Sequence, residues 1–402
     1  MEPATEQLPV VRPAPAKTPA AERIPRTTRP WRRAVLAGCA IFAASRAGIA
    51  AVSVLAWIGD PAPGKSPTHV AWLWASQWDS KWFIAIAEHG YQRTSDASPA
   101  AFFPLYPLLI RVLTPLCGHR EWVAALLVAN AALLAALILL YRLTDLELGR
   151  AAAGRAAFYL VAFPTGFFLS AAYNEGLFIA LVLATVYCLR RRLWWSAGAL
   201  GALAAATRSA GILLAAAFVF EYARTRPKRW SEICALIVIP GGLGAVMLVN
   251  KIAYGDPLAF SHTQATHWGR HLTWPWQAPL DAARNAGPPF TEIWAHNVLE
   301  LATVAALAAL LLPWLRRPRD QAIFPLLGLA LLTFMVSFPS RYTSDIPYPL
   351  YSASRIGLEI FPAFMALGAL GRRPWLDRGV LVLFLTTQGV LAAHFLHGGW
   401  VA

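Results

Sequence analysis

The sequence predicts an all-α polytopic membrane protein. Of its 402 residues, 57% are hydrophobic and only 14% are charged, a composition that excludes an ordinary soluble domain. Apolar runs long enough to cross the hydrocarbon core of a bilayer recur from residue 34 onward, and short basic clusters separate them. These observations predict about eleven transmembrane helices, joined by outer-face loops and short interfacial helices.

The first 33 residues differ in composition from the rest of the chain. Residues 1–33 are rich in Pro, Ala, Thr and Arg without apolar periodicity, so we predict a disordered cytoplasmic tail. The apolar run 34–59 follows without an obvious small-residue cleavage site, and it is too long for the apolar core of a signal peptide. It is expected to remain as the first membrane helix, and residues 34–402 are expected to form a single transmembrane domain.

The basic clusters explain the formal net charge of +14 better than nucleic-acid binding does. Because cytoplasmic loops are enriched in Lys and Arg, the clusters predict a multi-pass plasma-membrane protein with its N-terminus inside and its C-terminus outside. Membrane lipid is an expected partner and nucleic acid is not. The clusters stand at residues 142–155, 190–192, 224–229, 316–319 and 372–378. The predicted spans are residues 34–59, 121–142, 156–173, 175–190, 194–207, 209–222, 233–253, 297–315, 321–338, 356–371 and 379–397.

Function is expected on the outer face, where irregular backbone, aromatic side chains and ionisable groups collect. About thirty residues separate Arg192 from Arg224, too few for two full crossings of a core about 30 Å thick. The tip of this short helical hairpin, at Arg208, is therefore expected below the outer surface, inside protein or a watery cavity. The longer outer segments are predicted at residues 60–120, 254–296 and 339–355.

Asp79 is the first candidate for chemistry. It stands in the sequence Trp-Asp-Ser-Lys-Trp at 78–82, and the apolar residues that follow share one face of a helix that begins near Asp79. A carboxylate at a helix N-terminus is favoured by the helix dipole, which keeps it ionised and able to accept a proton. The alternative is that Asp79 only caps this helix.

Arg208 is the second candidate. An Arg at the tip of a short hairpin is costly in hydrocarbon and needs a partner. A phosphate would satisfy it, because a guanidinium matches phosphate oxygens bidentately. The alternative is a buried ion pair with Glu175 or Glu359.

Glu175 and Arg355 are two further charged residues, and each has more than one possible role. Glu175 follows Tyr173 and Asn174 where two spans meet on the outer side, and it can either cap the next helix or bind sugar hydroxyls. Arg355 and Glu359 stand four residues apart and can simply pair with each other. Arg355 is also a candidate contact for a lipid headgroup.

Metal ligation and organic cofactors find little support in the sequence. The histidines of the 254–296 segment show no i,i+4 pair in a helical pattern with an acidic partner at ligand spacing. The 4 cysteines are scattered without a metal or disulfide pattern. We predict no metal site and no cofactor, and a requirement for a divalent metal in the reaction stays open.

An ordered set of motifs carries a family resemblance. From about residue 34 to 402 the chain resembles the PIG-V family, the GPI mannosyltransferase 2-like proteins and their bacterial relatives, within the GT-C class of integral-membrane glycosyltransferases. The motifs are Trp78-Asp79, Gly90-Tyr91, Phe102-Phe103-Pro104-Leu105-Tyr106-Pro107, Tyr173-Asn174-Glu175, Thr207-Arg208-Ser209-Ala210-Gly211, Gly255-Asp256-Pro257 with Gln264 and Trp268, Arg355 before Phe361-Pro362, and Trp400-Val401-Ala402.

The resemblance implies a hexosyltransferase that moves mannose from a polyprenyl- or dolichyl-phosphate donor on the non-cytoplasmic face. It implies that Asp79 is the general base and that Arg208 meets the donor phosphate. Asp79 and Arg208 would then act from opposite sides of one cavity, with inversion by a single displacement. The expected donor-phosphate contacts are Arg208, Arg355 and Lys81, and the expected substrate contacts are Trp78, Tyr106, Asn174, Glu175, Gln264 and Trp268.

Other functions remain open alternatives. A transporter or lipid flippase would carry acidic relays inside its spans and similar halves, whereas the only charge in the middle of a predicted span is Arg46. A non-catalytic GT-C-like scaffold subunit is the third possibility. The Ala- and Arg-rich composition suggests a high-GC bacterium, so a cell-envelope glycolipid, glycan or protein is the expected acceptor.

Overall fold

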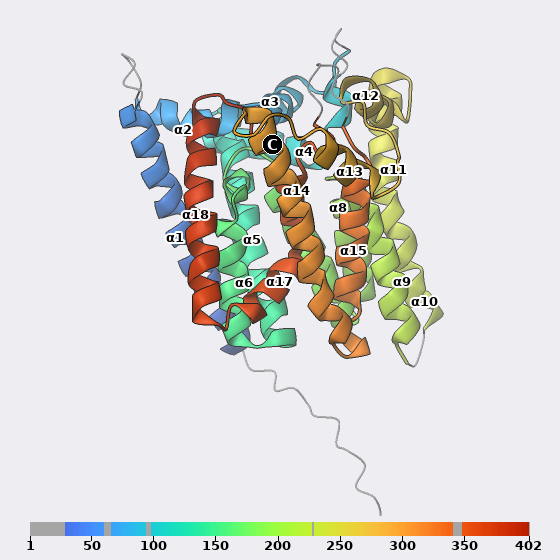
Figure 1. Ribbon diagram of the computed structural model, residues 1–402. Coiled ribbons are helices and arrows are strands. Elements are labelled where there is room, and N and C mark those ends of the chain that lie inside the picture. Colours follow the sequence, from blue (N-terminus) through green and yellow to red (C-terminus); the bar gives the residue numbers. More distant parts are fainter. Residues whose placement is uncertain (1–28, 60–65, 94–97, 227–228, 341–347, 402) are drawn as a thin grey trace, which may run out of the picture.

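The prediction of an all-α protein is confirmed by a computed structural model, in which all regular structure of the described residues is helical (Figure 1). The structure describes residues 29–59, 66–93, 98–226, 229–340 and 348–401. Most of the predicted tail 1–33 therefore lies outside the described residues, and its last five residues already belong to the first helix, α1 (Arg29–Gly59).

Among the described residues, six helical stretches are long and apolar enough to cross a membrane, by length and composition. A bent pair, Ala353–Glu359 with Phe361–Leu370 at 80°, makes up to seven if it is counted as one span. The protein is thus a multi-pass membrane protein. The long stretches are α1, α5 (Glu121–Leu148), α11 (Ala235–Tyr254) preceded by α10 (Trp230–Ile233), α14 (Glu292–Leu311), α15 (Ile323–Val336) and α18 (Pro374–Leu396).

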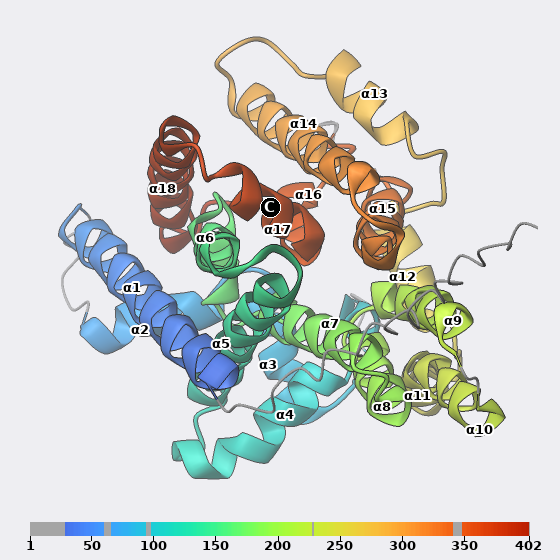
Figure 2. The same ribbon diagram turned by 90° about the horizontal axis from the view of Figure 1, so that it is seen from below.

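The remaining predicted spans each contain a helix of 16 residues or fewer, so the count of eleven crossings stays a prediction. These helices are packed to different depths: α7 lies against α5 and α8, and α17 lies against α6, within the bundle (Figure 2), whereas α8 and α9 keep exposed apolar side chains. They are α6 (Arg150–Ala162), α7 (Glu175–Arg190), α8 (Trp194–Ala205), α9 (Leu214–Arg224) and α17 (Phe361–Leu370). A 3-10 turn, η4 (Ser209–Leu213), joins the α8 side of the hairpin to α9.

Short helices gather at the upper end of the bundle in Figure 1, as expected for the outer segments. Ser66 caps the first of them, because its Oγ accepts a hydrogen bond from the backbone N–H of His69. They are α2 (Pro67–Ser76), α3 (Asp79–His89), α4 (Leu105–Leu113), α12 (Ala259–His267) and α13 (Gln277–Arg284), with the 3-10 turns η1 (Ser98–Ala101) and η2 (Thr114–Cys117). In the segment 339–355, residues 341–347 lie outside the described residues.

The basic turns lie at the opposite end (Figure 1). There Arg190 at the end of α7 donates from Nε to Glu147 Oε1 of α5 at 2.9 Å, and its Nη1 lies 3.4 Å from Glu221 Oε1 of α9. The same Nη1 donates to the Asp320 carbonyl oxygen at 2.8 Å, so one guanidinium ties three helices to the turn before α15. That end also holds the 3-10 turns η5 (Leu312–Arg316) and η6 (Arg319–Gln321).

Candidate active site

A cavity of about 700 Å³ lies beneath the short helices of the upper end. Its walls come from α3, the start of α7, the α8–η4 tip, α12, α15 and the short helix α16 (Ala353–Ile356) with the 3-10 turn η7 (Gly357–Glu359). Segments from all three predicted outer loops and from the short hairpin therefore meet in one place. Nine of the predicted site residues line it: Trp78, Asp79, Lys81, Asn174, Glu175, Arg208, Gln264, Trp268 and Arg355.

Tyr106 is the exception among the predicted substrate contacts. Its side chain is fully buried, its hydroxyl donates to the Ala125 carbonyl oxygen at 2.9 Å, and its ring packs edge-on against Phe83. A Tyr whose polar tip is satisfied inside the protein acts as a core residue. The structure therefore gives Tyr106 a packing role between α4 and α5 rather than a place in the cavity.

Asp79 is the first residue of α3, so the alternative that it is the N-cap is wrong. The N-cap is Trp78, whose φ of 49° is a strained conformation for a bulky residue. Trp78 Nε1 donates to the Gly399 carbonyl oxygen at 3.2 Å, which helps to hold this backbone in place. The turn aims the Asp79 carboxylate at the cavity, with the positive end of the α3 dipole behind it.

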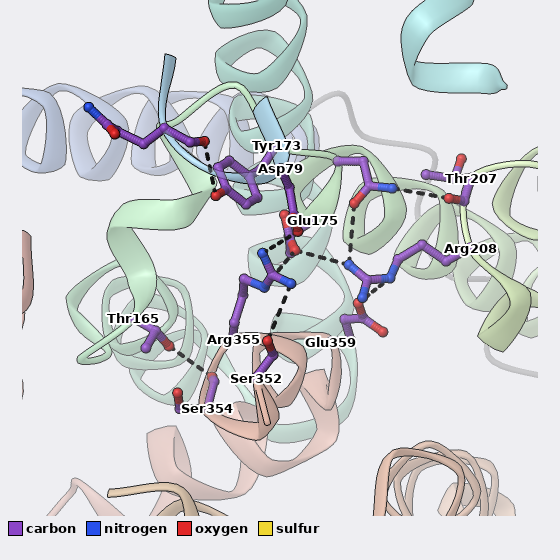
Figure 3. A network of polar contacts seen from close by, with 12 residues as sticks. Asp79, Thr165, Tyr173, Glu175, Thr207, Arg208, Ser352, Ser354, Arg355 and Glu359 are labelled. Atoms are coloured by element: carbon purple, nitrogen blue, oxygen red, sulfur yellow. Dashed lines mark hydrogen bonds and ion pairs between the residues drawn. The ribbon is translucent and has the colours of Figure 1, made fainter. Parts of the chain in front are cut away.

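Arg355 is the direct partner of Asp79. Its Nη1 donates to Asp79 Oδ2 at 2.7 Å, and its Nε lies 3.5 Å from Glu175 Oε1 (Figure 3). The Asp79 side chain is 30% exposed against 9% for Arg355, so Asp79 stays open to the cavity while its counterion is buried. The alternative that Arg355 pairs with Glu359 gives way to these contacts, because α16 ends and the 3-10 turn η7 begins before Glu359.

Arg208 stands at the tip of the short hairpin, in extended backbone between α8 and η4. Its Nη1 lies 3.0 Å from Glu175 Oε1, and its Nε lies 2.9 Å from Glu359 Oε1. Asn174 adds a contact, with its Oδ1 accepting from Arg208 Nη1 at 3.3 Å. The alternative that Arg208 pairs with Glu175 or Glu359 is therefore confirmed for both carboxylates (Figure 3).

Arg355 is further held by two aromatic rings between α6 and α7 and by Ser352 of its own segment. Its guanidinium carbon lies 5.2 Å from the ring centroid of Tyr173 and 5.4 Å from that of Phe168. Its Nη2 lies 3.4 Å from the hydroxyl of Ser352, a buried residue with a φ of 66°. Positive φ values at both Trp78 and Ser352 put strained backbone on both sides of the Asp79–Arg355 pair, a pattern typical of functional sites.

The buried carboxylate of Glu300, on α14, also supports the segment that carries Arg355. Glu300 accepts hydrogen bonds from the backbone N–H of Ser354 and from its Oγ, the latter at 2.9 Å. The Ser354 carbonyl oxygen in turn accepts from Thr165 Oγ1 at 2.8 Å. These bonds fix the backbone one residue before Arg355, so the position of Arg355 depends on α14 as well as on α16.

The residues that line the cavity but are absent from the sequence-based site include Arg270, Tyr351 and Trp400. Trp400 stacks on Tyr351 with ring centroids 4.4 Å apart. Trp400 is part of a motif of the family resemblance, and Arg270 follows the motif residue Trp268 by two positions. The sequence therefore carried a signal that could have pointed to both residues. In the described part of the chain, no group of three or more His, Cys, Asp or Glu side chains is placed to hold a metal ion.

Comparisons with known proteins show what the chain resembles. Residues 66–226 match the family described as Mannosyltransferase (PIG-V). GPI alpha-1,6-mannosyltransferase 2 of Cricetulus griseus is 36% identical over 148 residues, which are 34% of this chain and 29% of that protein. The human protein of the same name is 32% identical over 148 residues, with the same coverage of 34% and 29%. The alignment thus spans under a third of these relatives' own length.

A solved structure extends the comparison to most of the chain. The crystal structure of ArnT from Cupriavidus metallidurans bound to undecaprenyl phosphate covers 87% of this chain and 77% of its own, with a TM-score of 0.50 and 14% sequence identity. This likeness concerns the fold. Residues 66–226, which carry Asp79, Glu175 and Arg208, thus match the PIG-V mannosyltransferase family, and the chain as a whole is similar in fold to ArnT.

Proposed function

We propose that the protein transfers mannose from a polyprenyl-phosphate-linked donor to a glycolipid, glycan or protein acceptor of the cell envelope. The observation that carries this proposal is the composition of the cavity. One cavity combines a polar wall, with Asp79 and its paired guanidinium groups, and an apolar wall from α11, α12 and α15. A ligand that fits both walls has a charged head and a hydrocarbon chain.

The apolar wall continues away from the polar one. It includes Phe260 of α12 and Phe334 and Met335 of α15. A second, almost entirely apolar cleft of about 610 Å³ lies between α9 and α15. Its lining includes Leu213 and Ala330, which are next in sequence to Ile212 and Leu331 of the cavity lining. A polyprenyl chain whose phosphate lies in the cavity has a path of matching chemistry between these helices.

The comparisons support the same substrate class. The aligned relatives carry the name mannosyltransferase, and the ArnT crystal holds undecaprenyl phosphate. A lipid-linked donor also suits a catalytic cavity set among membrane helices, because such a substrate stays in the bilayer while its head enters the protein.

In the proposed reaction, Asp79 acts as the general base. The acceptor oxygen bonds to the anomeric carbon of mannose while the bond from that carbon to the phosphate oxygen breaks. The electron pair of the broken bond goes to the phosphate, and the proton of the acceptor hydroxyl goes to Asp79. Attack from the face opposite the phosphate inverts the anomeric centre in a single displacement.

The ion pair with Arg355 suits Asp79 to this role. A carboxylate 2.7 Å from a buried guanidinium is held in one orientation by a charge-assisted hydrogen bond. Its partial exposure leaves room for an acceptor hydroxyl to approach within hydrogen-bond reach.

The test is sugar transfer in membranes carrying wild type or Asp79→Asn, supplied with radiolabelled polyprenyl-phosphate mannose and native lipid extract. We expect wild type to make a labelled product, and Asp79→Asn to lose about 10²-fold or more in rate, because the amide cannot accept the proton. Glu88→Gln, at the exposed far end of α3, is the matched control and should keep the wild-type rate.

Other outcomes separate the alternatives. Wild-type transfer that persists in Asp79→Asn contradicts the role of Asp79 but keeps the enzyme. An absence of transfer by folded wild type, with native acceptors present, contradicts the proposed donor and favours another sugar donor, a transporter or a scaffold subunit.

A further inference from the structure

Arg270 is a cation in the cavity that differs from the other two guanidinium groups. It lines the cavity, its side chain is half-buried, and its Nε is buried without a hydrogen-bond partner among the described residues. Arg208 and Arg355, by contrast, are each within ion-pair distance of two protein carboxylate groups. Arg270 thus brings a positive charge to the cavity that the neighbouring carboxylates leave uncompensated at close range.

The backbone holds Arg270 in place. The segment follows α12, and the Arg270 N–H donates to the Gln264 carbonyl oxygen at 3.1 Å. Gly269 turns the chain with a φ of 59°, in the region that favours glycine. The Trp268 carbonyl oxygen accepts from Ser340 Oγ at 2.7 Å, which ties the segment to the chain leaving α15. A guanidinium on such a fixed turn is preorganised for a ligand.

The surroundings of Arg270 make its charge costly. Burial, followed by the positive charges of Arg355 and Arg208, lowers the pKa of Arg270 to about 10, and the Asp79 carboxylate offsets only part of this effect. At neutral pH the side chain still carries its proton. A half-buried cation among other cations is destabilising unless an anion compensates it.

The existing pairs limit what Arg208 and Arg355 can do for a phosphate. Glu175 is 1% exposed and serves both guanidinium groups, and Asp79 and Glu359 take one each. A phosphate that bound Arg208 or Arg355 would have to compete with these carboxylates. A phosphate can bind Arg270 without displacing a protein carboxylate from it.

We propose that Arg270 is the principal ligand of the donor phosphate and of the phosphate group released by the reaction, while Arg208 and Arg355 position Asp79 and Glu175. This inference rests on the proposed function and names the anion site within it. When the bond from the anomeric carbon breaks, the phosphate changes from a singly charged diester to a doubly charged monoester. Arg270 would stabilise that additional charge where it develops.

The test measures binding to the purified full chain in detergent, with undecaprenyl phosphate and the alcohol undecaprenol as probes. We expect wild type to prefer the phosphate, and Arg270→Gln to reduce that preference about tenfold or more. Arg270→Lys should keep part of it, because the charge remains while the fork of donors is lost. Arg284→Gln, an exposed position on α13, is the control and should bind as wild type does.

The apparent melting temperature distinguishes phosphate binding by Arg270 from a purely structural role of this residue. Because Arg270→Gln removes an uncompensated charge, the apparent melting temperature without lipid should stay the same or rise, while the added stability from undecaprenyl phosphate falls. A lower melting temperature without lipid, with phosphate preference intact, would overturn the inference.

Two further outcomes are distinguishable. If Arg270→Gln keeps the preference and Arg208→Gln loses it, the anion site lies at Arg208, and the lipid-phosphate donor survives without this inference. If wild type binds both probes equally, the proposed donor fails and this inference falls with it.

Discussion

Glu175 is the carboxylate that joins the two ion pairs of the cavity. Its Oε1 lies 3.0 Å from Arg208 Nη1 and 3.5 Å from Arg355 Nε, and its side chain is only 1% exposed. Figure 3 shows the two guanidinium groups on either side of it. Asp79, the proposed base, is therefore connected to the hairpin tip through Arg355 and Glu175, and a change at Glu175 is expected to disturb both Asp79 and the tip.

We predict that Glu175→Gln destabilises the protein by about 3–5 kcal/mol, because breaking a buried ion pair leaves charge uncompensated. Glu359→Gln should cost less, since the Glu359 carboxylate has an ion pair with Arg208 alone in the described residues. The measurement is the apparent melting temperature in detergent, with the exposed Glu88→Gln as control. Equal melting temperatures for Glu175→Gln and the control would contradict the central position of Glu175.

The individual side chains show which features of the site could be predicted from the neighbouring sequence. Asp79 at a helix start and Arg208 at a hairpin tip follow from nearby sequence, so both were predictable. The partner of Asp79 was not, because Arg355 lies 276 residues away and only the fold brings the two together. Tyr106 shares a recognisable motif but faces the core, and Arg270 lies between helices without any periodicity.

Two helices near the cavity, α8 and α11, pack backbone against backbone. A Cβ on Gly198 of α8 would lie 2.3 Å from the Ala235 carbonyl oxygen, and a Cβ on Gly242 of α11 would lie 1.9 Å from that of Ala202. Small residues permit such close approach in membrane bundles. Since α8 leads to Arg208 and α11 leads toward α12, this contact sets the distance between two walls of the cavity.

Gly242→Ala is therefore expected to force the two helices apart, at a cost of about 1–3 kcal/mol. The neighbouring Gly241→Ala is a matched control, because a Cβ there meets nothing within 4 Å and Ala favours the helix. The apparent melting temperature and the transfer rate should fall together in Gly242→Ala and stay unchanged in Gly241→Ala. Similar behaviour of the two variants would contradict the close packing of α8 and α11.

The sequence located the helices better than it counted the crossings. Every predicted span contains a helix, because apolar runs between basic clusters are an unambiguous signal. The number of crossings depends on where short helices such as α8 and α9 end within the bundle, which tertiary packing decides. The bend of 80° between η7 and α17 lies inside a single predicted span, residues 356–371, where Glu359 and Pro362 flank the break between the two helices.

The bundle as a unit has two chemically different ends (Figure 1). One end carries the short helices, the cavity and the chain terminus marked C, and the other carries the basic turns. In membrane proteins the basic turns face the cytoplasm. The cavity is thus expected to open to the outer side, where envelope acceptors are found.

Cysteine labelling in intact cells tests this orientation. After the 4 native cysteines are replaced, single cysteines are placed at the exposed positions Asn285, after α13, and Arg317, between η5 and η6. A membrane-impermeant maleimide should label Asn285→Cys from outside and Arg317→Cys only after the membrane is opened, because the charged reagent cannot cross hydrocarbon. Both variants should retain transfer, which shows that the fold survives the changes. The reverse labelling pattern would place the basic turns outside, and the proposed site of mannose transfer would then have to move to the cytoplasmic side.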